Sequence, residues 1–487
     1  MPNLICNALA EPVPAVDLLP VTNPYNGREL ARVERADSQG VESALRTADS
    51  LHRDRRKWLP AHARIAVLRR AAELMSARFE ELARTAAAEG GKPLQDSCAE
   101  VMRAIDAVRN CAELVRNHAG CEIPMGVTAA SEGRLAFTTY EPRGPVVAIS
   151  AFNHPLNLIV HQVAPAVAAG CPVIVKPAED TPLSCFRFIA LLHEAGLPAG
   201  WAQAVMTDLV ATSERLVTDP RVALFSFIGS SRVGWHLHSK LAPGTRCALE
   251  HGGAAPVLVD KTADLERIVP MLAKGGFYHA GQVCVSVQRV FVDRALVGEL
   301  ADRLVAAAQT QRVGDPMDEH VDIGPLIRPG EVERVHAWVR EACDAGARLL
   351  TGGEPVSTSC YQPTVLLDPP DHAKVSRQEI FGPVVCVYAY DELDDAIARA
   401  NALPFAFQGA VFSRDLDTAL RVASHLDASA VMVNDHTAFR TDWMPFAGLR
   451  QSGLGIGGIP HSFNDMRVEK MLVFNSPALA AGQHRGG

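Results

Sequence analysis

From about residue 144 onward, short runs of wholly apolar residues alternate with longer amphipathic stretches. The apolar runs fall at 145–149, 171–175, 201–205 and 222–227, with helical patterns at 164–169 and 182–195 between them. A strand that is apolar along its whole length is buried on both faces, as in parallel sheets covered by helices. The alternation therefore predicts a parallel, doubly wound α/β sheet, which binds ligands beyond the carboxyl ends of its strands.

The rest of the chain divides around this sheet. A second alternating region begins near 255, with strands expected at 288–292, 384–388, 409–412 and 430–433 and helices at 295–311, 330–346 and 415–425. Long helical patterns fill 38–120, whereas 134–140 and 466–474 have the character of strands. Residues 1–20 show little pattern and predict a mobile tail or a strap, and the Gly/Ala-rich end predicts fraying. A length of 487 residues suggests two or three domains.

Composition excludes several classes of protein. The net charge is −8, so no broad basic surface for nucleic acid is expected. No apolar stretch is long enough to cross a membrane, and the amino terminus lacks the pattern of a secretory signal, so we expect a cytoplasmic protein. The 11 cysteines are scattered without a CxxC pair, which fits a reducing compartment and predicts no metal site.

Cys284 lies just after Gly281 in an apolar run, Phe277 to Ser286. Glycine allows close approach of another backbone, so its position predicts a packed turn. On composition alone, an inert buried thiol is favoured over a nucleophile, because free cysteine usually behaves as a small hydrophobic residue. Other motifs in the chain change that balance.

Two further motifs follow strands of the first sheet. Gly229 and Ser230 lie between a strand and a helix, where Ser230 either caps the helix or donates to a bound phosphate. Lys176 and Glu179 come at the end of another strand, close to where parallel sheets bind ligands. Exposed charges at a strand end are the alternative explanation for this pair.

Together with 250–253, 152–155 and 379–383, these motifs resemble the aldehyde dehydrogenase superfamily over nearly the whole chain. The resemblance implies that Cys284 is the nucleophile, Asn153 the oxyanion donor and Glu250 the base that activates water. Glu250 also indicates the non-acylating branch, since the CoA-acylating members lack this base. A capping asparagine and a salt-bridged carboxylate are the structural alternatives. His251 departs from the family, in which an apolar residue is more usual.

The resemblance also implies a dinucleotide site. Gly229 and Ser230 would bind the pyrophosphate turn, and Lys176 and Glu179 the adenine ribose. Glu379 would contact the nicotinamide ribose and Phe381 the nicotinamide ring, in a stretch that otherwise predicts only a turn. A carboxylate repels a 2′-phosphate, so NAD is expected, with NADP possible as an alternative.

The segment 434–446 resembles the branch with lactaldehyde and phosphonoacetaldehyde dehydrogenases. Arg103, His154 and Arg440 are candidates for a cationic substrate pocket, since arginine binds phosphonate, sulfonate or carboxylate through charge-assisted hydrogen bonds. Each has an alternative as a salt-bridged or structural residue. The sharpest expectation is oxidation of a short anionic aldehyde such as phosphonoacetaldehyde. The alternative enzymatic function is that of a semialdehyde dehydrogenase for a carboxylate-bearing substrate such as succinate semialdehyde. A non-catalytic scaffold on the same fold is a further alternative from another class of protein.

The resemblance implies three parts. We expect a Rossmann-like NAD-binding domain at 1–121 and 144–253, a catalytic α/β domain at 254–459, and a small β arm from 122–143 and 460–487. The family uses such an arm to extend a neighbour's sheet, so a homodimer or homotetramer is expected. Beyond the small-molecule aldehyde, no nucleic acid or membrane partner is expected.

Overall fold

A six-stranded sheet forms the centre of the first unit in this computed structural model, which describes residues 3–481. Its strand order is β20-β10-β9-β6-β7-β8, and every strand except β20 is parallel to its neighbours. The strands are β6 (Val146–Ile149), β7 (Val173–Lys176), β8 (Ala202–Ala204), β9 (Leu224–Ile228), β10 (Arg246–Glu250) and β20 (Gly453–Leu454). The predicted parallel sheet is thus confirmed, with β10 as a strand that the apolar pattern did not reveal.

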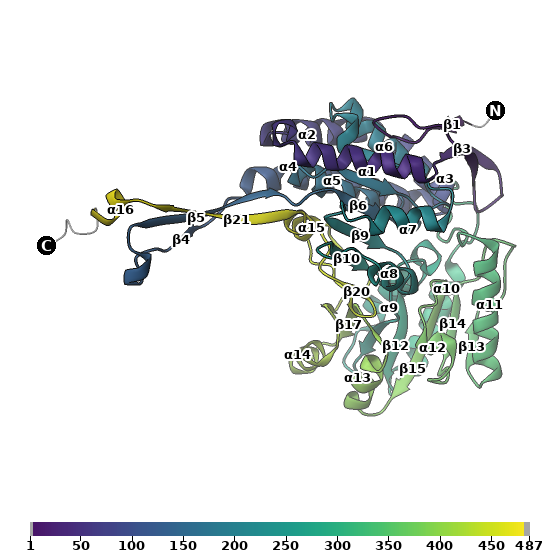
Figure 1. The fold of residues 1–487 in the computed structure, drawn as a ribbon. Coiled ribbons are helices and arrows are strands. Elements are labelled where there is room, and N and C mark those ends of the chain that lie inside the picture. Colours follow the sequence, from purple (N-terminus) through teal and green to yellow (C-terminus); the bar gives the residue numbers. More distant parts are fainter. Residues whose placement is uncertain (1–2, 482–487) are drawn as a thin grey trace.

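Helices cover both faces of this sheet (Figure 1). They are α1 (Ser38–Arg53), α2 (Ala61–Ala77), α3 (Phe79–Gly90), α4 (Leu94–Asn117), α5 (Asn157–Ala169), α6 (Leu183–Glu194), α7 (Val210–Thr218) and α8 (Ser231–His238). Every residue of α5 is buried, because this helix lies between the sheet and α2, α4 and α15. Short 3₁₀ turns complete the unit at η1 (Arg55–Lys57) and η3 (Ala199–Trp201), whereas η2 (Ala129–Ser131) lies outside it, in the projecting arm.

The amino-terminal segment pairs with other strands, so of the two predictions for residues 1–20, a mobile tail or a strap, the described residues agree with the strap. β1 (Asn3–Ile5) pairs in parallel with β3 (Glu29–Arg35), and β2 (Asp17–Thr22) pairs antiparallel to the same strand. Ala8 also exchanges backbone hydrogen bonds with Ala204 of the main sheet. These strands are held by pairing with distant residues. A short sequence without periodicity gives no sign of such pairing.

A seven-stranded sheet organises the second unit, in the order β13-β14-β15-β12-β11-β17-β18. Only the β13–β14 pair is antiparallel. The strands are β11 (Ala255–Val259), β12 (Val287–Asp293), β13 (Arg348–Thr351), β14 (Thr364–Leu367), β15 (Val384–Tyr390), β17 (Gln408–Phe412) and β18 (Ala430–Val433). The helices are α9 (Leu265–Phe277), α10 (Val297–Thr310), α11 (Pro329–Asp344), α12 (Lys374–Arg377), α13 (Leu393–Asn401) and α14 (Leu416–His425), with a small β16 (Phe405–Ala406) and β19 (Leu449–Arg450) pair.

A thin arm of three antiparallel strands projects from the body (Figure 1). It contains β4 (Glu122–Ile123), β5 (Arg134–Pro142) and β21 (Arg467–Asn475), followed by α16 (Pro477–Ala481). The expected frayed end falls on 482–487, outside the described residues. α15 (Ile459–Asp465), which our expected domain bounds cut at its first turn, packs on α5 and α4 of the first unit. Between residues 3 and 481, no helix has both the length and the apolarity needed to cross a membrane.

Candidate active site

A cavity of about 1020 Å³ lies where the two units meet, and every predicted site residue lines it. The first unit supplies Arg103, Asn153, His154, Lys176, Glu179, Gly229, Ser230 and Glu250, and the second supplies Cys284, Glu379, Phe381 and Arg440. The first group is brought together by topology. The chain runs from β6 to β7 on one side and returns to β9 on the other, which opens a crevice at the carboxyl ends of these strands.

Cys284 sits in the turn that connects η4 (Tyr278–Gly281) to β12. His279, Ala280 and Gly281 have φ values of 49°, 54° and 71°, so three successive residues adopt left-handed backbone. A Cβ atom on Gly281 would lie 2.0 Å from the carbonyl oxygen of Gly382. The packed turn predicted from Gly281 is therefore confirmed, and it fixes the position of the thiol.

Gln282 anchors this turn to its surroundings. Its Nε2 donates to the carbonyl oxygens of His279 and Pro325, at 3.3 and 3.2 Å, and its Oε1 accepts from the Ile327 N–H at 2.9 Å. Its own backbone carbonyl accepts a 2.9 Å hydrogen bond from Asn153 Nδ2. Sequence reasoning missed Gln282, although a buried amide within an apolar run was the available signal.

The electrostatic surroundings keep the Cys284 thiol protonated. Burial raises its pKa to about 12, and although the positive charge of Arg440 opposes this shift, Glu379 and Glu250 add to it. Free thiols ionise near 8.5, so the thiolate is strongly disfavoured before substrate arrives. A reaction at this thiol would therefore require a group that accepts its proton.

Glu250 is the last residue of β10 and faces the same cavity. A Cβ atom on Gly457 would lie 2.1 Å from Glu250 Oε1, so this glycine makes room for the carboxylate. Burial raises the pKa of Glu250, and Arg440 partly counteracts it. A carboxyl group with a raised pKa is suited to general base catalysis near neutral pH.

The unusual His251, which follows Glu250, connects the end of β10 to the Gly229 turn. Its Nδ1 lies 2.8 Å from the Gly229 carbonyl oxygen, which can only accept, so Nδ1 carries the proton. Burial lowers the pKa of His251, which is consistent with a neutral ring. A Cβ atom at Gly234 would lie 2.0 Å from His251 Cε1. The imidazole therefore depends on the small residue at 234.

The cofactor end of the cavity contains polar groups without protein partners. Ser230 precedes α8, yet its side chain makes no capping hydrogen bond. Glu379 Oε1 is buried and has no hydrogen-bond partner, and burial raises the pKa of this carboxyl group to about 8. Lys176 is buried, whereas Glu179 is exposed. These groups fit a dinucleotide, whose phosphate and ribose hydroxyls would satisfy them.

Phe381 has a left-handed backbone, with φ of 49°, and packs edge to face on Phe152 at 5.8 Å between ring centroids. Both rings line the cavity. The strained backbone at Phe381 thus presents an apolar ring to this space.

Arg103, His154 and Arg440 lie at the other end. Arg103 forms a two-point ion pair with Asp442, at 2.7 and 3.1 Å, so its salt-bridged alternative is realised. The Arg440 guanidinium lies 3.5 Å from the centre of the Phe446 ring, and its buried Nε has no hydrogen-bond partner. Burial holds the pKa of His154 well below its usual value, so this ring is neutral.

Sequence reasoning missed further residues of this end. Lys274 and Tyr278 line it, with the Lys274 ammonium 4.8 Å from the centre of the Tyr278 ring. Asp442 accepts hydrogen bonds from Asn157 Nδ2 and His161 as well as Arg103. Burial alone would raise the pKa of Asp442, but these donors outweigh it and hold the pKa well below its usual range.

Comparison with known proteins places this site in a family. A sequence model of the aldehyde dehydrogenase family matches residues 14–472. The chain is 38% identical over 456 residues to a 3-sulfolactaldehyde dehydrogenase of Priestia aryabhattai, covering 93% of this chain and 94% of the relative.

Solved structures agree in fold. Aldehyde dehydrogenase 21 of Physcomitrella patens, in complex with the reaction product succinate, superposes with a TM-score of 0.93 at 34% identity, covering 98% of this chain and 99% of that one. A glyceraldehyde-3-phosphate dehydrogenase of Methanocaldococcus jannaschii complexed with NADP gives a TM-score of 0.90 at 33% identity, covering 94% and 99%.

The chain therefore belongs to the aldehyde dehydrogenase family. The predicted family resemblance and the predicted fold are both confirmed. It oxidises aldehydes with NAD(P), and the solved structures that it resembles include complexes with NADP and with NAD⁺.

Proposed function

We propose that Cys284, Asn153 and Glu250 perform the oxidation without acyl transfer to CoA. The Cys284 sulfur attacks the aldehyde carbon, and its proton passes to a basic group. The second N–H of Asn153 Nδ2 and the Cys284 backbone N–H stabilise the oxyanion of the thiohemiacetal. A bound oxidised nicotinamide supplies the acceptor for the hydride, which leaves a thioester on Cys284. Glu250 removes a proton from water, and the resulting attack releases the carboxylic acid and the thiol.

The observation that carries this mechanism is the Asn153–Gln282 hydrogen bond. It holds an amide donor from the first unit beside the backbone of the Cys284 turn. The raised pKa of Glu250 supports its role as the base. A non-catalytic scaffold is disfavoured, because it has no need for a thiol, an amide and a buried carboxyl group on one cavity wall.

We propose further that Lys176 and Glu179 bind the adenine ribose, Gly229 and Ser230 the pyrophosphate, and Glu379 and Phe381 the nicotinamide riboside. The exposed Glu179 carboxylate favours NAD, because it would repel a 2′-phosphate. The M. jannaschii complex contains NADP, so NADP is kept as a second cofactor for the test. Titration of each dinucleotide by protein fluorescence, with Glu179→Ala as the variant, measures this preference without turnover.

The substrate that we propose is a short aldehyde with an anionic terminal group. Arg440, whose Nε has no partner, is the group that would bind the anion, with His154 as a neutral donor beside it. Arg103 holds Asp442 and would contribute mainly by shape. Phosphonoacetaldehyde remains our first expectation from sequence. Two relatives extend the set of candidate terminal anions. The name of the Priestia relative indicates a sulfonate, and the succinate complex of the P. patens enzyme indicates a carboxylate.

A panel of aldehydes tests this proposal. NADH production should be fastest, in kcat/KM, with an aldehyde that bears a phosphonate, sulfonate or carboxylate, and slowest with propanal. Arg440→Gln should remove that preference, measured as the ratio of kcat/KM for the anionic aldehyde to that for propanal, because a change in Cys284 reactivity affects both substrates. Equal activity on charged and neutral aldehydes would refute the anion site but keep the dehydrogenase.

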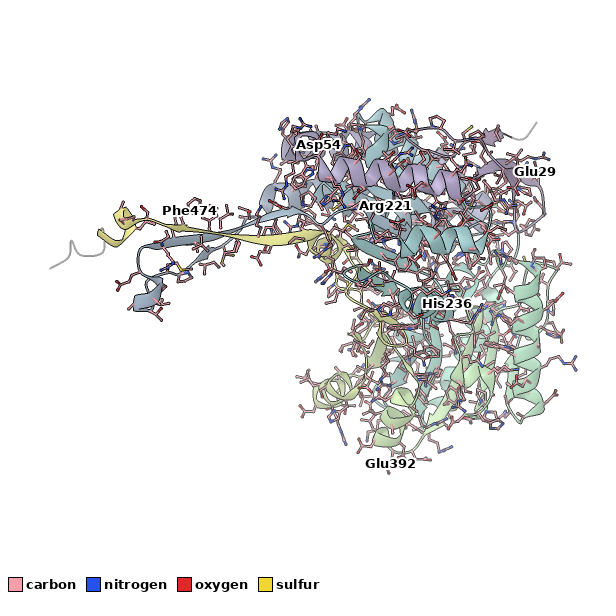
Figure 2. All side chains as sticks on the ribbon, in the orientation of Figure 1. Glu29, Asp54, Arg221, His236, Glu392 and Phe474 are labelled. Carbon is pink, nitrogen blue, oxygen red and sulfur yellow. The ribbon has the colours of Figure 1, made fainter. Side chains whose placement is uncertain are left out.

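We also propose a cytoplasmic homo-oligomer. All cysteines are free thiols, in keeping with a reducing compartment. β21 forms an unpaired edge of the arm and exposes Val468, Met471, Val473 and Phe474, and Figure 2 shows Phe474 far from the body. An apolar edge of this kind invites pairing with a second copy of the chain.

A further inference from the structure

We infer that the substrate end of the cavity carries one uncompensated positive charge and therefore selects a monoanion, a sulfonate over a fully ionised phosphonate. This inference rests on the proposed anionic substrate and narrows its class. The physical basis is the balance between the cationic side chains around the pocket and the carboxylates that already pair with them.

Three cationic side chains line this end: Arg103, Lys274 and Arg440. Arg103 is paired with Asp442 at 2.7 Å, and Lys274 with Asp96 at 2.8 Å. Arg440 forms no ion pair with any described residue, and its Nε has no hydrogen-bond partner. Two of the three charges are thus neutralised within the protein, and one remains for a ligand.

The three cations surround the same space. The Lys274 ammonium lies over the Tyr278 ring, and the centre of this ring is 6.2 Å from that of His154. His154 in turn feels the positive charges of Arg103 and Arg440. A terminal anion beside His154 therefore interacts with all three cations and with both of their carboxylate partners, not with Arg440 alone.

The other titratable groups facing this space do not change the count. Lys92, whose positive charge also acts on His154, is paired with Glu100 at 2.5 Å. His279 is neutral, because burial holds its pKa well below the usual value. Burial lowers the pKa of His154 and of His436 and raises that of Tyr278, so all three are neutral around pH 7. Burial also raises the pKa of Cys284 to about 12, which keeps the thiol uncharged. Glu250 is the carboxylate whose charge acts most on Arg440, but it forms no ion pair with it, and burial raises its pKa and so favours its neutral form.

A sulfonate carries a single negative charge at any pH used for assay. A phosphonate carries one charge or two, because its second proton leaves near neutral pH, as that of a phosphate monoester does at about 6. The second charge would have no free cation in this pocket and would lie near Asp442 and Asp96. An unpaired charge in such a site is strongly disfavoured.

Sulfoacetaldehyde and phosphonoacetaldehyde form a matched pair for the test, since they differ only in the anion. The measured quantity is the ratio of kcat/KM for the phosphonate to that for the sulfonate, between about pH 6 and about pH 8.5. Titration of Cys284 or Glu250 cancels in this ratio. We expect it to fall by at least about tenfold as pH rises, because one unmatched charge is added.

Asp96→Asn provides the complementary change. It removes the partner of Lys274 and adds a second free charge, so the ratio at high pH should rise by about tenfold. Asp264→Asn is the matched control, since it breaks the exposed ion pair with Arg414, which lies outside the cavity. It should leave the ratio unchanged.

The outcomes separate the two proposals. A ratio that stays flat or rises with pH, while both anions remain preferred over propanal, overturns the monoanion inference alone. No preference for either anion over propanal overturns the proposed substrate class, and this inference with it. An Asp96→Asn variant that behaves like Asp264→Asn also contradicts the charge count.

Discussion

The side-chain amide of Asn153 donates a hydrogen bond to the backbone carbonyl of Gln282 at 2.9 Å. Asn153 belongs to the loop after β6, and Gln282 to the turn that carries Cys284, so this bond joins the two units across the cavity. It also fixes one N–H of the amide and leaves the other for the oxyanion in the mechanism that we propose. Positioning and oxyanion stabilisation would then depend on the same side chain.

Asn153→Ala should lower kcat by about 10²–10³-fold, the usual cost of losing an oxyanion donor. The KM for the aldehyde should change much less, since the donor acts mainly on the developing charge. Steady-state kinetics measure both. Asn110→Ala, which removes an amide bonded only to Asp106 on the surface of α4, is the control. A higher KM with an unchanged kcat would contradict the proposed role of Asn153 as an oxyanion donor.

Glu250→Gln should separate hydride transfer from hydrolysis. The first turnover should still release NADH as a burst, while the steady-state rate falls by about 10²–10⁴-fold, the range for a general base. Because burial raises the pKa of Glu250, the wild-type rate should decline on acidification at a pH above the ordinary carboxyl pKa of about 4.3. Stopped-flow absorbance measures the burst. If the variant shows no burst, Glu250 is needed for a step before hydride transfer, which would contradict its proposed role in hydrolysis.

Alkylation of Cys284 should be slow at neutral pH and rise about tenfold for each pH unit, since only the thiolate reacts and its pKa is raised to about 12. Arg440→Gln should slow the reaction further, because the charge of Arg440 lowers the thiol pKa. Peptide mapping after iodoacetamide treatment distinguishes Cys284 from the exposed Cys6 and Cys121. A rate that levels off near pH 7 would contradict this picture.

The chain's patterning predicted most strands of both sheets, because a wholly apolar strand is a local signal, but it missed β11, β13 and β14 of the second sheet. β10 escaped detection since Arg246 and Glu250 at its ends break the apolar run. The catalytic groups could be predicted only through family resemblance, as Cys284 alone favoured an inert thiol. The Arg103–Asp442 pair could not be predicted, because these residues are 339 positions apart and meet only when α4 packs against the loop after β18.

A charge on the outer edge of the arm should block assembly. Val473→Asp or Phe474→Asp places a carboxylate on an exposed apolar strand, where pairing with another copy would bury it. Light scattering after gel filtration should then give a mass of 52.3 kDa instead of a multiple of it. Glu392→Lys, on the exposed far end of the second unit in Figure 2, should leave the oligomer intact. Unchanged mass in both arm variants would exclude the arm as the interface.

Glu100 links the stability of α4 to the loop that carries Asn153. Its carboxylate pairs with Lys92 at 2.5 Å, with both side chains fully buried, and accepts hydrogen bonds from the Leu156 and Asn157 N–H groups. Glu100→Gln leaves the Lys92 charge buried without a partner, so the free energy of unfolding should fall by about 3–5 kcal/mol. Denaturant unfolding measures this loss, and Glu73→Gln, in an exposed ion pair with Arg70, should stay within about 0.5 kcal/mol of wild type. Because the same carboxylate holds the start of α5, kcat should fall as well, and a destabilised variant with full kcat would show that the loop is positioned by other contacts.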